Sequence, residues 1–282
     1  MLMRFLFNIL LCSAGLQLQA QTDTLLQTGS AFASAPSVTI YSGKARQFAA
    51  DNLGNVYVLT PAGLLIKFNN KGDSLNAFNE VRRYGTVYAM DVTNPMKVLL
   101  YYKDFSTIVM LDRYLNRINM IDLRKSGIFQ AKAVGLAYDN NVWILDEQSA
   151  TLKKIDENGR LISETADLRQ VLDVTPSPTK IIDRDGFVYV YDIANGLYVF
   201  DYYGTLKNTI ALTGVSDLQV IGKTIAGRRQ HEFVRYTTGT LELKEAPLPL
   251  AIQEAAKIYI TQQGIYVLNE TGIVLYPITK ER

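Results

Sequence analysis

Residues 48–58 read FAADNLGNVYV, and the same pattern returns at residues 137–146 as AYDNNVWILD and at residues 180–192 as KIIDRDGFVYVYD. In each copy a polar turn containing Asp, Asn or Gly separates one short apolar run from the next. A further apolar run and a second Asn/Gly turn follow, as in residues 64–68 and 70–72. Turns of this composition between short β-branched and aromatic runs indicate antiparallel strands joined by tight turns.

The pattern repeats with a nearly constant spacing. In each copy, the second strand follows the first turn. These second strands begin at Val56, Val98, Val142, Val188 and Ile265, which are 42, 44, 46 and 77 positions apart. The last step is nearly twice the others, so one weaker copy is expected inside it, where four short strand-like runs occur at 216–221, 223–226, 231–236 and 240–243. A period of about 40–50 residues that holds four strands is typical of a β-propeller blade.

The repeat count predicts an all-β fold, a six-bladed β-propeller that spans residues 37–282 as one domain. Each blade is a small sheet with two apolar faces, which the neighbouring blades must cover. The final unit stops after three strands, whereas Ser37–Ser42 has the pattern of the missing fourth strand. We therefore expect this N-terminal strand to pair with Ile273–Pro277, which completes the last blade and closes the ring. An open solenoid is the alternative, but it would need distinct caps that the sequence does not show.

Equivalent aromatic residues in four of the repeats give a prediction about the core. They occupy the same position of the second strand, where alternation directs them between neighbouring blades, so we expect them to be largely buried: Tyr57, Trp143, Tyr189 and Tyr266.

The composition bounds the function classes. The chain has 282 residues, of which 48% are hydrophobic, and 29 Lys and Arg residues stand against 27 Asp and Glu residues. The apolar fraction excludes a disordered chain, and the balanced charge gives no electrostatic reason to expect binding to nucleic acid or an anionic membrane. A single Cys and a single His exclude an internal disulfide framework and a poly-His metal site.

The N-terminus has the pattern of a cleaved secretory signal peptide over residues 1–20. Arg4 precedes an apolar run at residues 5–16, which is too short to span a membrane, and Ala20 stands at the expected cleavage point. Leu11 before Cys12 argues against a lipoprotein, since a small residue normally stands there. We expect residues 21–36 to form a lead-in segment and the mature protein to be periplasmic or secreted, without a transmembrane span.

The Asp/Gly turns, without Trp-Asp dipeptides, show a family resemblance. Over residues 37–282 the chain resembles the NHL-type and TolB-like six-bladed propellers, and its Ala20-Gln21 junction resembles those of exported Bacteroidetes propeller proteins. The NHL-type resemblance implies the fold but no activity.

The loops between the second and third strands of each blade meet at a mouth of the central channel, where propellers hold ligands. The candidate residues there are Thr60, Lys103, Asp104, Asp146, Glu147, Asp192, Gln230, His231, Asn269 and Glu270. Gluconolactonase-like propellers hold a divalent metal with an acid, an Asn and an Asp from separate blades, and a loose version of that set could be assembled here from Asp146, Asp192 and Asn269, although nothing in the spacing singles them out. We favour the alternative that these side chains cap their own turns, and we predict no cofactor.

Candidate residues for partner binding lie in other loops. Tyr202 and Tyr203 precede Gly204 in a turn, and Tyr114 lies in the equivalent turn of another blade. Tyr contributes contact area at small entropic cost, so an aromatic binding edge is one prediction. Arg228 and Arg229 are the alternative anchors.

Two functions from different classes follow from these features. The favoured hypothesis is a non-enzymatic propeller of the cell envelope that binds or scaffolds a protein. The expected partner is an outer-membrane complex such as the type 9 secretion translocon, in which this protein would be the pore-blocking subunit. The alternative is a metal-dependent hydrolase or lactonase that uses Asp146, Asp192 and Asn269. A serine hydrolase is disfavoured because no nucleophile elbow is present.

Overall fold

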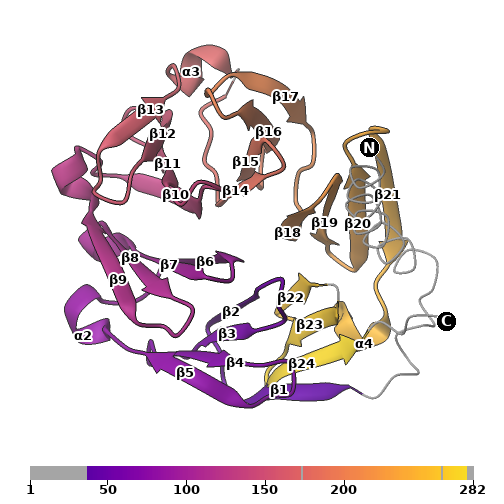
Figure 1. The fold of residues 1–282 in the computed structure, drawn as a ribbon. Coiled ribbons are helices and arrows are strands. Elements are labelled where there is room, and N and C mark those ends of the chain that lie inside the picture. Colours follow the sequence, from indigo (N-terminus) through magenta and orange to yellow (C-terminus); the bar gives the residue numbers. More distant parts are fainter. Residues whose placement is uncertain (1–36, 173, 262, 278–282) are drawn as a thin grey trace, which may run out of the picture. The chain divides into compact units, whose positions relative to one another are not determined.

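The computed structural model describes residues 37–172, 174–261 and 263–277, so the predicted signal peptide and lead-in segment lie outside the described residues. In the described part, the strands form six four-stranded antiparallel sheets (Figure 1). The protein is an all-β six-bladed β-propeller, which confirms the predicted fold. No helix of the described residues has both the length and the apolar character needed to cross a membrane.

The chain forms two compact units, of which the larger comprises residues 44–214. It holds four sheets, each made of four consecutive strands in chain order. The first two sheets consist of β2 (Gln47–Ala50), β3 (Val56–Leu59), β4 (Leu65–Phe68) and β5 (Ser74–Phe78), and of β6 (Ala89–Asn94), β7 (Lys97–Tyr102), β8 (Thr107–Asp112) and β9 (Arg117–Asp122). The third and fourth consist of β10 (Ala131–Leu136), β11 (Val142–Asp146), β12 (Thr151–Ile155) and β13 (Leu161–Glu164), and of β14 (Lys180–Arg184), β15 (Phe187–Asp192), β16 (Gly196–Asp201) and β17 (Leu206–Ile210).

The first strands of consecutive sheets lie beside one another in this unit, because β2 contacts β6, β6 contacts β10 and β10 contacts β14. Four short helices connect or interrupt the sheets: α2 (Val81–Tyr84), η2 (Lys103–Phe105), η3 (Leu123–Ser126) and α3 (Leu168–Val171).

The smaller unit holds the remaining two sheets. The fifth sheet is made of β18 (Ser216–Ile221), β19 (Thr224–Arg229), β20 (Glu232–Thr237) and β21 (Glu242–Pro247), and the helix α4 (Leu250–Gln253) follows it. The weak fifth repeat therefore exists where it was expected, but β19 extends beyond the predicted run at 223–226.

The sixth sheet combines both ends of the described chain. Its strands are β22 (Lys257–Ile260), β23 (Gly264–Leu268), β24 (Gly272–Pro277) and the N-terminal β1 (Val38–Ser42). In the register of β1 and β24, Val38 lies opposite Leu275 and Ser42 lies opposite Gly272. This pairing confirms that an N-terminal strand completes the last blade.

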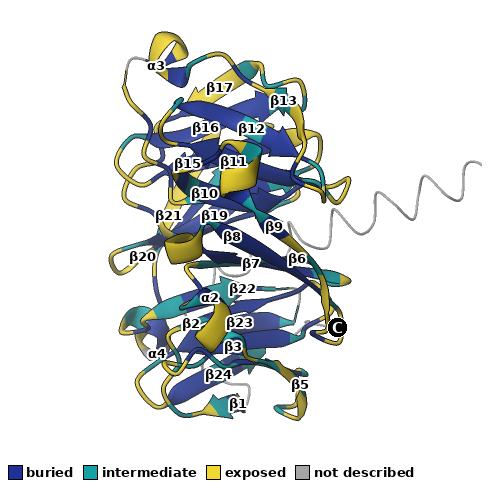
Figure 2. Cartoon of the chain, turned by 90° about the vertical axis from the view of Figure 1, so that its left-hand side faces the viewer, coloured by how far each residue is buried: buried dark blue, intermediate teal, exposed yellow. Residues whose placement is uncertain are grey.

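The core lies between the sheets of each unit. Figure 2 shows strands such as β11, β15 and β16 as largely buried, whereas the turns at their ends are exposed. All four aromatic residues expected in the core are buried: Tyr57, Trp143, Tyr189 and Tyr266. Trp143 belongs to an apolar cluster that also contains Ile181 and Val188 of the fourth sheet, so it joins two blades.

One turn recurs between the third and fourth strands of four successive sheets. The side chain of its first residue accepts hydrogen bonds from the backbone N–H groups two and four positions later, which fixes the turn. The first residues are Asn69, Asp112, Asp156 and Asp201. The side chain two positions later is exposed in every copy: Lys71, Tyr114, Asn158 and Tyr203.

Candidate functional site

The carboxylates proposed for the channel mouth form hydrogen bonds and ion pairs with nearby groups of the protein. Asp192 is 1% exposed and is the last residue of β15. Its carboxylate accepts hydrogen bonds from the backbone N–H groups of Ser177, Ala194 and Asn195 and from the side chain of Asn195. Burial raises the pKa of Asp192, but these hydrogen bonds outweigh it and hold the pKa below its ordinary value.

The two other candidate metal ligands are held in a similar way. Asp146 forms an ion pair of 2.6 Å with Lys153 and accepts the backbone N–H of Gln148. The side-chain oxygen of Asn269 accepts the backbone N–H and the hydroxyl of Thr271, and the backbone N–H of Gly272. Within residues 37–277, as far as the structure describes them, the His, Cys, Asp and Glu side chains form no group of three or more that could hold a metal ion.

The other predicted mouth residues lie, sheet by sheet, between the second and third strands. Thr60 accepts the backbone N–H of Leu64, and Glu147 pairs with Lys132. The remaining positions fall in η2 or in turns that the strand bounds define: Lys103, Asp104, Gln230, His231 and Glu270.

Arg228 and Arg229, proposed as partner anchors, lie at the end of β19. Arg228 is buried, forms an ion pair with Asp217 at 2.7 Å, and donates to the backbone carbonyls of Ala255 and Ala256. Arg229 pairs with Glu245 of β21. Arg228 therefore connects β18 and β19 with the segment that leads into β22, and it leaves little surface for a partner.

The three tyrosines proposed for partner binding lie in turns between third and fourth strands. These turns are at the opposite end of the sheets from the loops between second and third strands. Tyr203 is 89% exposed, and Tyr114, at the equivalent turn position, is 52% exposed. The guanidinium of Arg113 lies 4.6 Å from the centre of the Tyr114 ring. Tyr202 is half-buried, and its hydroxyl donates a hydrogen bond of 2.8 Å to Asp183.

Tyr202 also forms a stacked pair with Tyr138, a residue of the β10–β11 turn. The ring centres are 4.5 Å apart and the planes differ by 12°. The ammonium of Lys154 lies 5.1–5.7 Å from the ring centres of Tyr138, Tyr202 and Trp143. Lys154 also forms an ion pair of 2.6 Å with Asp139. The buried ammonium of Lys154 therefore stabilises the stacked pair of Tyr138 and Tyr202, two residues that are far apart in the sequence.

Asp183 connects this aromatic pair to the core. It accepts hydrogen bonds from the indole N–H of Trp143 at 2.9 Å and from the hydroxyl of Tyr202. Burial raises the pKa of Asp183 above its ordinary value, although the hydrogen bonds from Trp143, Tyr202 and the backbone of Tyr138 oppose the shift. Burial, followed by the hydrogen bond to Asp183, raises the pKa of the Tyr202 hydroxyl. The proton of this bond therefore stays on the tyrosine.

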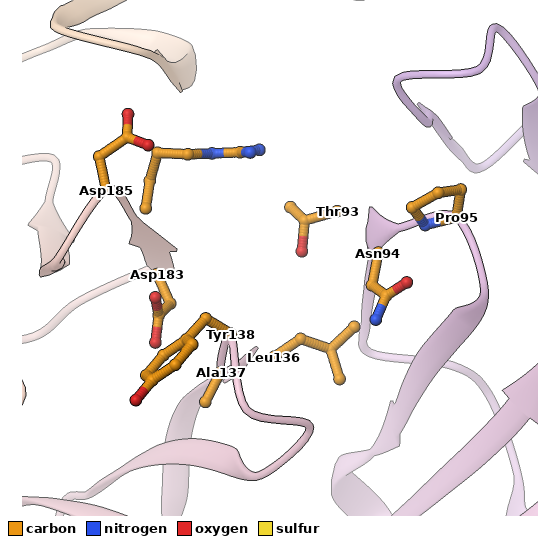
Figure 3. A pocket seen from close by; sticks show the side chains of 9 residues that line it. Thr93, Asn94, Pro95, Leu136, Ala137, Tyr138, Asp183 and Asp185 are labelled. Atoms are coloured by element: carbon orange, nitrogen blue, oxygen red, sulfur yellow. The ribbon is translucent and has the colours of Figure 1, made fainter. Parts of the chain in front are cut away.

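A hollow of about 340 Å³ lies beside this group. Figure 3 shows Thr93, Asn94 and Pro95 on one side, Asp183 and Asp185 on the opposite side, and Leu136, Ala137 and Tyr138 between them. The lining residues come from the ends of β6, β10 and β14 and the turns that follow these strands. The hollow thus lies where first strands turn into second strands, at the opposite end of the sheets from the predicted mouth residues.

Sequence reasoning missed the residues that build this group: Tyr138, Lys154, Asp183 and Arg184. Tyr138 stands in a polar turn of the repeat, and a large aromatic side chain in such a turn is a usable signal. The contacts of Lys154 and Asp183 cross from one blade to the next, which the repeat spacing alone does not indicate.

Comparison with known proteins identifies the fold. No protein-family model matches the sequence, and no curated protein is significantly similar to it. Among solved structures, the chain is similar to virginiamycin B lyase from Staphylococcus aureus, with 11% identity over 86% of this chain and 99% of that chain at a TM-score of 0.57. It is also similar to the Neurospora crassa Pan2 WD40 domain, with 14% identity, 86% coverage of both chains and a TM-score of 0.58. BamB from Moraxella catarrhalis shows 13% identity over 83% of both chains at a TM-score of 0.50. At these identities the likeness is one of fold.

Proposed function

We propose that this protein is a non-enzymatic propeller of the cell envelope that binds another protein through its tyrosine face, defined as Tyr114, Tyr138, Tyr202 and Tyr203. The observation that carries the proposal is the placement of these four side chains in turns at one end of the second, third and fourth sheets. Tyr203 is 89% and Tyr138 is 65% exposed. Large aromatic side chains gathered on exposed turns favour an interface over a purely structural role.

The side chains of Tyr138 and Tyr202 in the tyrosine face are preorganised in the unbound protein. Tyr138 and Tyr202 are stacked, and the hydrogen bond from Tyr202 to Asp183 fixes the ring of Tyr202. Lys154 lies close to both rings and is itself held by Asp139. Ordering side chains on association costs free energy, so an aromatic pair that is already ordered binds at lower cost.

The compartment part of the proposal rests on the sequence. The signal-peptide pattern of residues 1–20 supports export, and the Ala20-Gln21 junction supports a Bacteroidetes-type envelope protein. An outer-membrane complex, with the type 9 secretion translocon as the specific candidate, is the partner class we put forward. Its recognition would not require the carboxylates Asp146 and Asp192, which are engaged within their own sheets.

Site-specific photo-crosslinking in the cells that produce the protein tests this proposal. A photoreactive residue at Tyr203 is compared with one at Phe105, an exposed aromatic residue (46%) in η2 at the other end of the sheets. We expect a discrete envelope protein to be crosslinked from position 203 and not from position 105, and Tyr138→Ala to reduce the yield. Equal yields from both positions, or no adduct together with a divalent-ion-dependent hydrolase activity lost in Asp192→Asn, would contradict the proposal.

A further inference from the structure

We propose that the hollow beside the tyrosine face binds a single carboxylate of the partner polypeptide, with an apolar side chain next to that carboxylate. This inference rests on the proposed function and names the chemistry that the partner presents. It is carried by Arg184, which lines the hollow between Asp183 and Asp185.

Within the described part of the chain, Arg184 is a cation with one unfilled hydrogen-bond donor, the Nε–H group. Its Nε atom is buried and finds no hydrogen-bond acceptor among the described residues. This Nε is shielded from solvent, so a ligand in the hollow would meet the terminal N–H groups of the guanidinium instead. The planar fork of Arg matches the two oxygens of a carboxylate.

The neighbouring acids do not take this role. Asp183 accepts hydrogen bonds from Trp143 and Tyr202 on both of its oxygens. Asp139 is paired with Lys154 at 2.6 Å. Asp185 is exposed and lies on the same side of the hollow as Asp183 in Figure 3. Its negative charge disfavours a dianion, so the geometry favours one carboxylate over a phosphate group.

The rest of the lining defines what accompanies the carboxylate. Among the described residues, the amide N–H₂ of Asn94 makes a long contact of 3.5 Å with the side-chain oxygen of Asn140, so it can donate to a ligand oxygen. Thr93 is not available in the same way, because its hydroxyl donates to Asp91 at 2.7 Å. Pro95, Leu136 and the exposed ring of Tyr138 form the apolar part of the lining. An apolar or aromatic residue beside a carboxylate fits this combination.

A matched pair of small probes tests the inference on the whole protein. N-acetyl-L-phenylalanine carries the carboxylate and an aromatic group, and N-acetyl-L-phenylalaninamide is its neutral counterpart; inorganic phosphate is the third probe. Affinities are measured by NMR titration on wild type, Arg184→Gln and Arg184→Lys. We expect the acid to bind at least about tenfold more tightly than the amide and than phosphate. The preference should disappear in Arg184→Gln and persist in part in Arg184→Lys.

The opposite results overturn the inference. Equal binding of acid and amide, a preference for phosphate, or an unchanged preference in Arg184→Gln each contradicts a carboxylate site at Arg184. If Arg184→Gln does not fold, as judged by thermal unfolding, Asn94→Ala replaces it; a reduced affinity for the acid supports the site and an unchanged affinity contradicts it.

The two proposals can fail separately. A Tyr203 crosslink that forms equally well in Arg184→Gln, together with the absence of acid binding, rejects the carboxylate site and leaves the proposed function standing. Acid binding that depends on Arg184, without any crosslink from Tyr203, rejects protein binding through the tyrosine face while the anion site remains.

Discussion

The two ends of the fourth sheet use the same residue type in different ways. At the end of β15, Asp192 is surrounded by backbone N–H donors and by Asn195 of its own turn, and its pKa is held below the ordinary value. At the end of β14, Asp183 receives its side-chain hydrogen bonds from Trp143 of the third sheet and from Tyr202, and its pKa is raised. One carboxylate shapes a turn, whereas the other joins blades beneath an exposed aromatic pair. The structural role of a carboxylate at a strand end can therefore be assigned only when its hydrogen-bond donors are known.

The largest effect is expected from removing the indole that joins Asp183 to the third sheet. Trp143→Ala leaves a cavity between two blades and removes a donor to the half-buried carboxylate of Asp183, so the free energy of unfolding should fall by about 3–5 kcal/mol. Trp143→Phe, which keeps most of the ring volume, is the matched control and should cost less. Urea denaturation measures both. A loss below about 1 kcal/mol in Trp143→Ala would show that the indole is not a core contact.

The next effect concerns the turn carboxylate. Asp192→Ala leaves several backbone N–H groups without their acceptor in a buried turn, and we expect a loss of about 1–3 kcal/mol. Asp192→Asn keeps one acceptor oxygen and should lose less. The same denaturation experiment measures both variants, and an Ala variant as stable as wild type would argue against the turn-capping role.

The pH dependence of stability separates the two carboxylates by sign. The lowered pKa of Asp192 means that its contribution is present above the pKa of the unfolded chain and is lost as the pH falls through the lower, folded value. The raised pKa of Asp183 means that its ionisation destabilises the folded state. This loss of stability develops as the pH rises from the pKa of the unfolded chain towards the higher pKa of the folded protein, and it persists above that pKa.

We therefore expect Asp192→Asn to weaken the acid-induced loss of stability. Asp183→Asn should remove a destabilising contribution that wild type acquires on going from acid to neutral pH. Denaturation curves from pH 3 to pH 7 provide the measurement. If both variants change the pH profile in the same direction, the contrast between the two carboxylates is wrong.

The smallest effect on stability is expected at the tip of the tyrosine face. Tyr203 is almost fully exposed, so Tyr203→Ala should change the free energy of unfolding by no more than about 0.5 kcal/mol. The same substitution should nevertheless reduce retention of the envelope partner identified by crosslinking, measured with purified components. Tyr203→Phe is the control and should retain most of the binding. Full binding by the Ala variant would remove Tyr203 from the interface.

The sequence predicted the blades well because their signals are local. Strands such as Val188–Val190 are apolar runs bounded by turn residues, and the unmatched strand at each end indicated the pairing of β1 with β24. The stacked pair was not predicted, because Tyr138 and Tyr202 belong to different blades and meet only when the sheets pack. The weak fifth repeat was predicted in place but not in length, because a strand that ends in Arg228 and Arg229 has no apolar run to mark its end.

The pairing of β1 with β24 has a consequence for the order in which the molecule is made. β1 is the first of the described strands, and its hydrogen-bonding partner lies at residues 272–275, more than two hundred positions later. Joining such distant segments carries a large loop-closure entropy and makes assembly of this sheet slow, so the sheet is expected to form after the intervening blades. Until then β24 exposes an unpaired edge to which the N-terminal strand of a second molecule could add, and strand exchange between copies is the characteristic error of such an architecture.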